Sequence, residues 1–284
     1  MTPSKPDRDA STRSPFAGCA IFIAAFAVMV FLIGFSTLTL FRQFREIAKF
    51  TDEKPLPIEI SSLDNQAPAQ RQLAERLESF RQQLGGDQAA TLTLSADDLN
   101  LAIATYDIFK ELRGTFRVME IQGEVLRIAI SFPLNGKPRF AHEDEPGWIA
   151  SDSRFLNGTL VARPNLLKHE VILSLDTIEV PGKRVAPEFI DQMSPYRITE
   201  RYLLDPILGP AMAKLTRVGV ADDKVTLTRK PNETPVDKIT DAQVDSASSR
   251  LFTALGLAAV GFLAFAGLIV FIGIRAKARK ARDV

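Results

Sequence analysis

The residues of this chain that could do chemistry are two histidines and a scattering of carboxylates. His142 begins the run His-Glu-Asp-Glu, where an imidazole and several carboxylate oxygens could bind a cation. These four residues are consecutive and lie in a predicted loop, so their side chains need not converge, and we interpret the run as a solvated acidic loop. His169 has no partner at a ligand spacing, and we interpret it as a surface or edge histidine on a strand.

No catalytic motif accompanies these residues. The sequence contains no HExxH, no GxSxG and no P-loop. A pair of carboxylates such as glycosidases use is recognised by the distance between them in the fold, so the sequence leaves that alternative open. We predict that the protein is not an enzyme and has no catalytic residue, no metal site and no cofactor.

Two long apolar segments, one near each end of the chain, indicate that the protein is anchored in a membrane. Residues 16–41 and 251–274 contain no Asp, Glu, Lys or Arg. As helices they would be about 39 Å and 36 Å long, and a bilayer core is about 30 Å thick. We therefore predict two transmembrane helices. A cleaved signal peptide is the alternative for the first segment, but no small-residue cleavage pattern follows it.

Basic residues near the spans predict the topology. Five of them lie in the last ten residues, whereas the other flank of the second span is acidic. We predict that both termini are cytoplasmic, in a cell (inner) membrane, and that the central domain is extracytoplasmic, which means periplasmic if the cell is Gram-negative. The predicted parts are a tail (1–15), the first span (16–41), a stalk (42–65), the domain (66–230), a polar tether (231–250), the second span (251–274) and a basic tail (275–284).

The composition argues against a disulfide-stabilised domain and against a nucleic-acid partner. The only cysteine, Cys19, lies in the first span, so the outer domain has no disulfide and relies on an ordinary core. Residues 42–250 are mildly acidic and lack the basic surface that nucleic acid requires. We predict no nucleic-acid partner.

The outer domain reads as an α+β fold with a largely antiparallel sheet and helices on one face, flanked by the two transmembrane helices. The prediction rests on apolar residues at helical spacing, on residues that can cap helices, and on the alternation of apolar and polar residues in the strands. The expected elements are a helix at 67–84, a strand at 92–94, a helix capped by Ser95 and Asp98, a hairpin of 115–121 with 124–132, a loop at 135–151, strands at 154–162 and 167–180, a proline-interrupted helical region at 187–216, and a hairpin of 217–220 with 224–228.

One predicted strand has apolar residues on both faces. In 167–180, Val171, Leu173 and Leu175 share one face, and Ile172 and Ile178 lie on the other. Something must cover the second face. The helical region 187–216 could do so, or a lipid chain could. Ile172 and Ile178 are therefore the candidate face for an apolar ligand.

Four segments carry a resemblance to a known family: LTLSADDLNLAI at 92–103, Phe155–Leu160, Ile178–Lys183 and Val185–Ile190. They resemble the YpmS-like family of membrane-anchored extracytoplasmic proteins of unknown function. The resemblance covers about residues 90–230, and its motifs are structural. It implies an N-terminal anchor before the domain, and relatives of similar build are suspected lipid binders. This chain departs from the pattern by its second span and by the helix at 67–84.

These observations favour a non-enzymatic extracytoplasmic domain that binds membrane lipid or another apolar envelope component. The alternatives are a structural or assembly subunit that docks on another envelope membrane protein or on a second copy of itself, and a cell-envelope hydrolase with unrecognised carboxylates. An apolar cavity would favour the first, an apolar surface patch the second, and a cleft with two facing carboxylates the third.

Overall fold

The computed structural model describes residues 15–59, 66–86 and 88–235, with a few positions between 256 and 275. The chain forms two units, one of Met1–Arg42 with Ser248–Val284 and the other of Gln43–Ala247. Among the described residues one helix is long and apolar enough to cross a membrane, by length and composition only: the segment Phe26–Phe50 of α1 (Pro15–Phe50). The second predicted span, most of the tether and the terminal tails lie outside the described residues.

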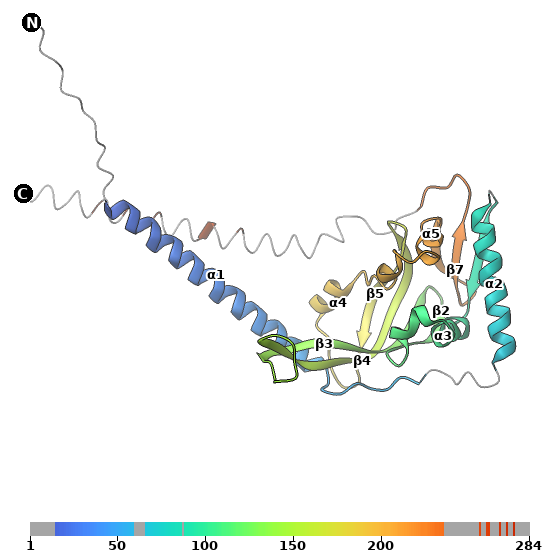
Figure 1. The fold of residues 1–284 in the computed structure, drawn as a ribbon, viewed down its shortest axis with the longest axis horizontal. Coiled ribbons are helices and arrows are strands. Elements are labelled where there is room, and N and C mark those ends of the chain that lie inside the picture. Colours follow the sequence, from blue (N-terminus) through green and yellow to red (C-terminus); the bar gives the residue numbers. More distant parts are fainter. Residues whose placement is uncertain are drawn as a thin grey trace, which may run out of the picture. The chain divides into compact units, whose positions relative to one another are not determined.

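The α+β class and the antiparallel pairing are confirmed, but the strands form two sheets where the sequence predicted one (Figure 1). In both sheets every neighbouring pair is antiparallel. The larger sheet has the order β2 (Phe116–Gln122), β3 (Val125–Phe140), β4 (Ile149–Leu167) and β5 (Glu170–Glu179). The smaller sheet has the order β1 (Ala90–Leu94), β7 (Lys224–Arg229) and β6 (Arg217–Ala221).

Short helices complete the domain, and three of them begin where the sequence provides a reason. Ser95 and Asp98 form the predicted capping box, with Asp98 N donating to Ser95 Oγ at 3.1 Å and Ser95 N to Asp98 Oδ2 at 2.9 Å. Proline stands at the start of two helices, where its missing N–H costs nothing. The helices are α2 (Ala67–Gly85), α3 (Ala96–Thr105), η1 (Asp107–Leu112), α4 (Pro187–Met193), η2 (Glu200–Tyr202) and α5 (Leu208–Met212).

The core consists of two clusters of buried apolar side chains. One cluster lies on the larger sheet and includes Ile128, Leu160 and Ile178. The other joins α2 to the smaller sheet through residues such as Leu73, Phe80 and Leu92. The stripe predicted for 67–84 therefore packs inside this chain.

The segment predicted as a stalk is fixed to the larger sheet instead. Phe50 is only 1% exposed, and its ring lies 4.8 Å from that of Phe189. Arg154 donates to the carbonyl oxygens of Ala48 and Thr51, both at 3.0 Å, and so satisfies the last turn of α1. Asp52 then forms a two-way backbone bridge with β4. The described residues of the predicted stalk that follow α1 are therefore held against the domain.

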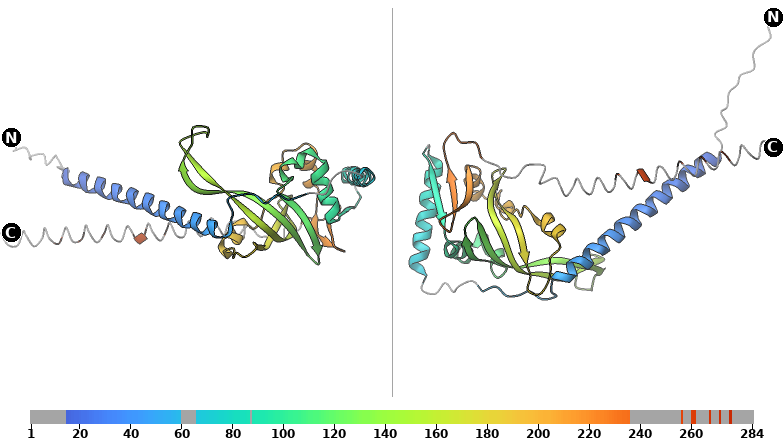
Figure 2. Two further views of the ribbon diagram at one scale, coloured as in Figure 1. Left: turned by 90° about the horizontal axis from the view of Figure 1, so that it is seen from below. Right: turned by 180° about the vertical axis from the view of Figure 1, so that it is seen from behind.

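The largest correction concerns residues 135–151, which were predicted to be a loop. β3 and β4 continue through this region to the pair Phe140–Ile149, with a register shift between Asn135 and Pro138. Gly136 makes the close pairing possible, because a Cβ there would lie 2.7 Å from the carbonyl oxygen of Asp152. We call the extension over residues 135–153 the arm, and Figure 2 shows it projecting from the rest of the sheet.

Candidate functional site

The end of the arm carries three large apolar side chains that are almost fully exposed. Phe140 is 86% exposed, Trp148 90% and Ile149 71%. Phe140 and Ile149 are directly opposed across the strands, so they share one face of the ribbon. Trp148 precedes the first residue of β4, and its backbone carbonyl accepts a hydrogen bond from Ala141 N at 3.1 Å. The tip therefore presents three apolar side chains to solvent.

Ionic contacts hold the arm in shape. The Arg139 guanidinium donates to both carboxylate oxygens of Glu145, each at 2.6 Å, and lies 3.2 Å from Asp152. The His142 amide also donates to Glu145, at 2.9 Å. The hydrogen bonds from Arg139, followed by that from His142, lower the pKa of Glu145 to about 2. The arm is a braced element whose apolar side chains are presented outward.

The charge around the tip is negative. Residues 135–153 contain two basic and four acidic residues. Arg139 is already bound by Glu145, whereas Glu143 and Asp144 are exposed in the turn. A surface that complements the tip would combine an apolar pocket with basic residues around it.

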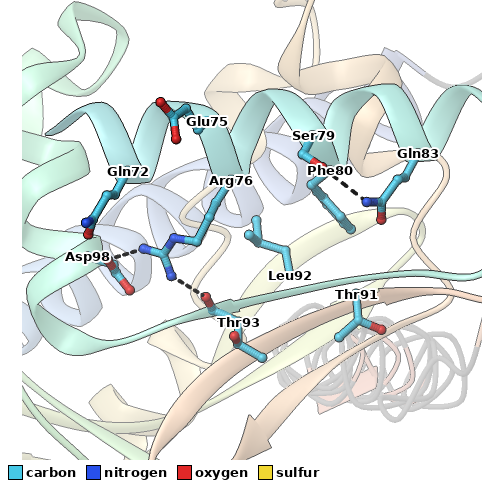
Figure 3. A pocket seen from close by; sticks show the side chains of 10 residues that line it. All are labelled: Gln72, Glu75, Arg76, Ser79, Phe80, Gln83, Thr91, Leu92, Thr93 and Asp98. Atoms are coloured by element: carbon cyan, nitrogen blue, oxygen red, sulfur yellow. Dashed lines mark hydrogen bonds and ion pairs between the residues drawn. The ribbon is translucent and has the colours of Figure 1, made fainter. Parts of the chain in front are cut away.

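A second candidate site is an open groove of about 720 Å³ between α2 and β1 (Figure 3). Phe80 and Leu92 line its apolar part. The rest of its lining is mostly polar and comprises Gln72, Glu75, Arg76, Ser79, Gln83, Thr91, Thr93 and Asp98. Arg76 crosses the groove, where it pairs with Asp98 and donates to Thr93 O at 3.3 Å.

A smaller depression of about 410 Å³ lies where the chain enters the domain. Asp52 there is paired with Lys183 and accepts from Asn157 at 3.0 Å. These two hydrogen bonds, with the Lys183 bond the larger cause, lower the pKa of Asp52. In the α2–β1 groove burial acts to raise the pKa of Asp98, but hydrogen bonds from Ser95 and Arg76 outweigh it and the net shift is downward. A general acid needs the opposite shift.

The two isoleucines of the candidate ligand face lie inside the domain. Ile172 is 0% exposed and Ile178 is 4% exposed. The segment after α4 pairs with the edge of β5, where Tyr196 and Leu173 exchange backbone hydrogen bonds of 2.8 and 2.9 Å. The register of β4 and β5 shifts beside Asp176, so Ile178 lies in the same core cluster as Leu173 and Leu175, and the predicted face shared by Ile172 and Ile178 is wrong. Side chains from 187–198 pack against that cluster. Lipid binding at these isoleucines stays a prediction.

The two histidines lie apart from each other and from the grooves. His142 is in the turn of the arm, as the predicted loop implied. His169 is in a tight turn between β4 and β5 rather than on a strand, because Lys168 and His169 have positive φ values of 47° and 67°. Over the part of the chain that the structure describes, no cluster of three His, Cys, Asp or Glu residues could hold a metal ion.

Sequence reasoning missed the arm and the groove. The arm's apolar residues stand among Gly, Pro and charged residues that favour a loop, and only the single Trp148 near Phe140 was a signal. The groove depends on β1 being an edge strand, which the sequence does not reveal. No family model matches this chain, and neither does any curated protein or solved structure. The resemblance to the YpmS-like family therefore stays a prediction.

Proposed function

We propose that this chain is a two-pass membrane protein whose extracytoplasmic domain is a non-enzymatic docking module. In this proposal the domain binds a protein partner of the same envelope through the tip of the arm, and both termini are cytoplasmic. The observation that carries the proposal is the exposure of Phe140, Trp148 and Ile149 on a braced element. Monomeric soluble surfaces rarely gather such side chains without an interaction to cover them.

Two further observations support docking over the other functions. The α2–β1 groove and the depression beside Asp52 are open and lined largely by polar residues, so neither resembles a lipid cavity. Asp52 and Asp98 are ion-paired with lowered pKa values, which is unlike the acid of a hydrolase. Trp148 is the expected centre of the contact, since tryptophan dominates binding hot spots.

Membrane lipid is the second candidate for what covers the tip. Tryptophan and phenylalanine are also typical of the bilayer interface, and an exposed apolar tip could insert there. The acidic turn argues against an anionic lipid surface, because Glu143 and Asp144 would approach it first. We therefore favour a protein with an apolar pocket and a basic rim.

Photo-crosslinking in the native membrane tests the proposal. A photo-reactive amino acid placed at position 148 of the full-length chain should give a discrete protein adduct, and one at position 204 should not. Leu204 is a matched control because it is 97% exposed and lies outside the arm. Adducts with lipid alone would favour the second candidate. Absence of any adduct at 148 beyond that at 204 would refute a role for the tip.

The adduct protein, once identified, allows a quantitative test. Trp148→Ala should weaken its binding by about 30-fold or more, because truncating a hot-spot tryptophan costs about 2 kcal/mol or more. Leu204→Ala should leave the affinity unchanged. Equal effects of both substitutions would contradict the proposal.

A further inference from the structure

We propose that the groove between α2 and β1 binds an extended peptide segment of a protein partner, which adds to the smaller sheet as a fourth strand beside β1. The site is built from other elements than the arm, so it stands or falls independently of the proposed function. The proposal rests on the free edge of β1, on the contacts that hold α2 beside the smaller sheet and on the charge of the groove.

The free edge of β1 faces the groove. β1 is the first strand in the order β1-β7-β6 and pairs only with β7 within that sheet. Thr93 O accepts a hydrogen bond from Arg76, so this carbonyl points away from β7. In an antiparallel strand the N–H and C=O of one residue point to the same side, and alternate residues share that side. The N–H and C=O of Thr91 therefore also face the groove.

Edge protection is the simplest alternative use of this arrangement. Proteins cover sheet edges with helices and place cations on them to prevent pairing with other chains. Here Arg76 engages the carbonyl of Thr93, while Thr91 is exposed and lines the open groove. The edge of β1 is therefore unprotected at Thr91. An added strand would pair with the backbone N–H and C=O of this residue.

The groove is preformed. Near one end Arg76 joins α2 to Asp98 and Thr93. At the other end Arg229 of β7 donates to the carbonyl of Leu84 at 2.7 Å and to that of Gly86. Phe80 and Leu84 anchor the helix between these contacts by burial. A peptide would thus enter a groove whose walls are already fixed, which reduces the ordering that binding requires.

The charge of the groove selects the peptide. Glu75 and Asp98 are acidic, and Arg76 is the single basic residue of the lining. Asp98 binds Arg76, whereas Glu75 takes part in no ion pair among the residues described. We expect a bound segment to place a lysine or arginine beside Glu75. The side-chain amides of Gln72 and Gln83 offer further hydrogen bonds to it.

The test uses the full-length chain in detergent micelles and a fluorescein-labelled peptide of sequence Thr-Val-Thr-Lys-Val-Thr-Val. Fluorescence anisotropy should show saturable binding above that to empty micelles, and hydrogen exchange of the Thr91 amide should slow. Among peptides that are each N-methylated at one amide, one should bind about fivefold more weakly, because it loses the donor to Thr91 O. Saturable binding that ignores N-methylation would overturn strand addition.

Charge reversal supplies the matched variants. Glu75→Lys should weaken binding of the lysine peptide about five- to tenfold and favour the same peptide with glutamate in place of lysine. Glu78→Lys makes the same change on the same helix outside the groove lining and should alter neither affinity. Equal effects of the two variants, or no saturable binding to the unaltered chain, would refute the site.

Discussion

Ile172→Ala is expected to lower the free energy of unfolding of the domain by about 3 kcal/mol. Ile172 is completely buried on β5, opposite Asn165 of β4. The substitution removes three carbons, each worth about 0.8 kcal/mol of transfer free energy, which gives about 2.4 kcal/mol. The cavity that remains after partial collapse adds to this, and the total stays in the usual range of about 2–5 kcal/mol.

The assay is urea unfolding of the purified full-length chain in detergent, followed by circular dichroism. Ile207→Ala is the matched control, because the same side chain is 60% exposed there. Its effect should stay within about 0.5 kcal/mol. The comparison isolates burial from any general effect of replacing isoleucine.

Removing lipid distinguishes two explanations for the burial of Ile172, which are packing by the domain itself and contact with a bound lipid. If the domain covers Ile172 by itself, extracting lipid should leave the stability of the unaltered domain and the effect of Ile172→Ala unchanged. A lipid bound at this face would stabilise the folded state by an amount that rises with the logarithm of the lipid concentration once this exceeds the dissociation constant. The reasoning fails if Ile172→Ala costs under 1 kcal/mol, or if its effect disappears after extraction.

Three further predictions follow from the described contacts and the termini. Ser95→Ala should cost about 1 kcal/mol in the same urea assay, because it removes the N-cap of α3, and an unchanged midpoint would contradict this. The pKa of Glu145, lowered to about 2 from 4.5, means that its contact with Arg139 stabilises the arm fully above about pH 4.5 and is lost as pH falls towards 2. Hydrogen exchange at the Ala141 amide, which bonds to Trp148 O, should therefore quicken across that window after correction for intrinsic rates, and Glu145→Gln should remove the dependence. An enzymatic reporter that works only outside the cytoplasm should be active when fused at residue 140 and silent after Val284, and the reverse pattern would exclude the predicted topology.

The parts of the fold that were predicted correctly are those with local signals. Ser95 and Asp98 stand at the spacing that a capping box requires, and both hydrogen bonds are present. The closing hairpin was visible because Asp222 and Asp223 separate two short apolar runs, and both adopt the positive φ that a tight hairpin needs. Such features depend only on residues a few positions apart.

The parts that were missed depend on contacts distant in sequence. β1 pairs with β7, so that Ala90 lies opposite Arg229. The sequence of neither strand predicts which strand it pairs with. This pairing divides the strands into two sheets and leaves the edge of β1 beside α2. The packing of the predicted stalk was missed for the same reason. It depends on hydrogen bonds from Arg154 to the carbonyl oxygens of Ala48 and Thr51, which are distant in sequence.

The arm has the composition of a loop but the backbone pairing of a β-ribbon. Gly136, Pro138 and the acidic turn are typical of a loop, yet ladder pairing and Arg139 hold the segment as a ribbon. A braced ribbon loses little conformational freedom when it binds, so the exposed area of Trp148 can contribute to affinity with little offset from ordering. The same bracing would be unnecessary in a solvated loop, whose only role is to connect two strands. The arm's ion pairs and its exposed tip are thus explained together by docking, whereas a connecting loop accounts for neither.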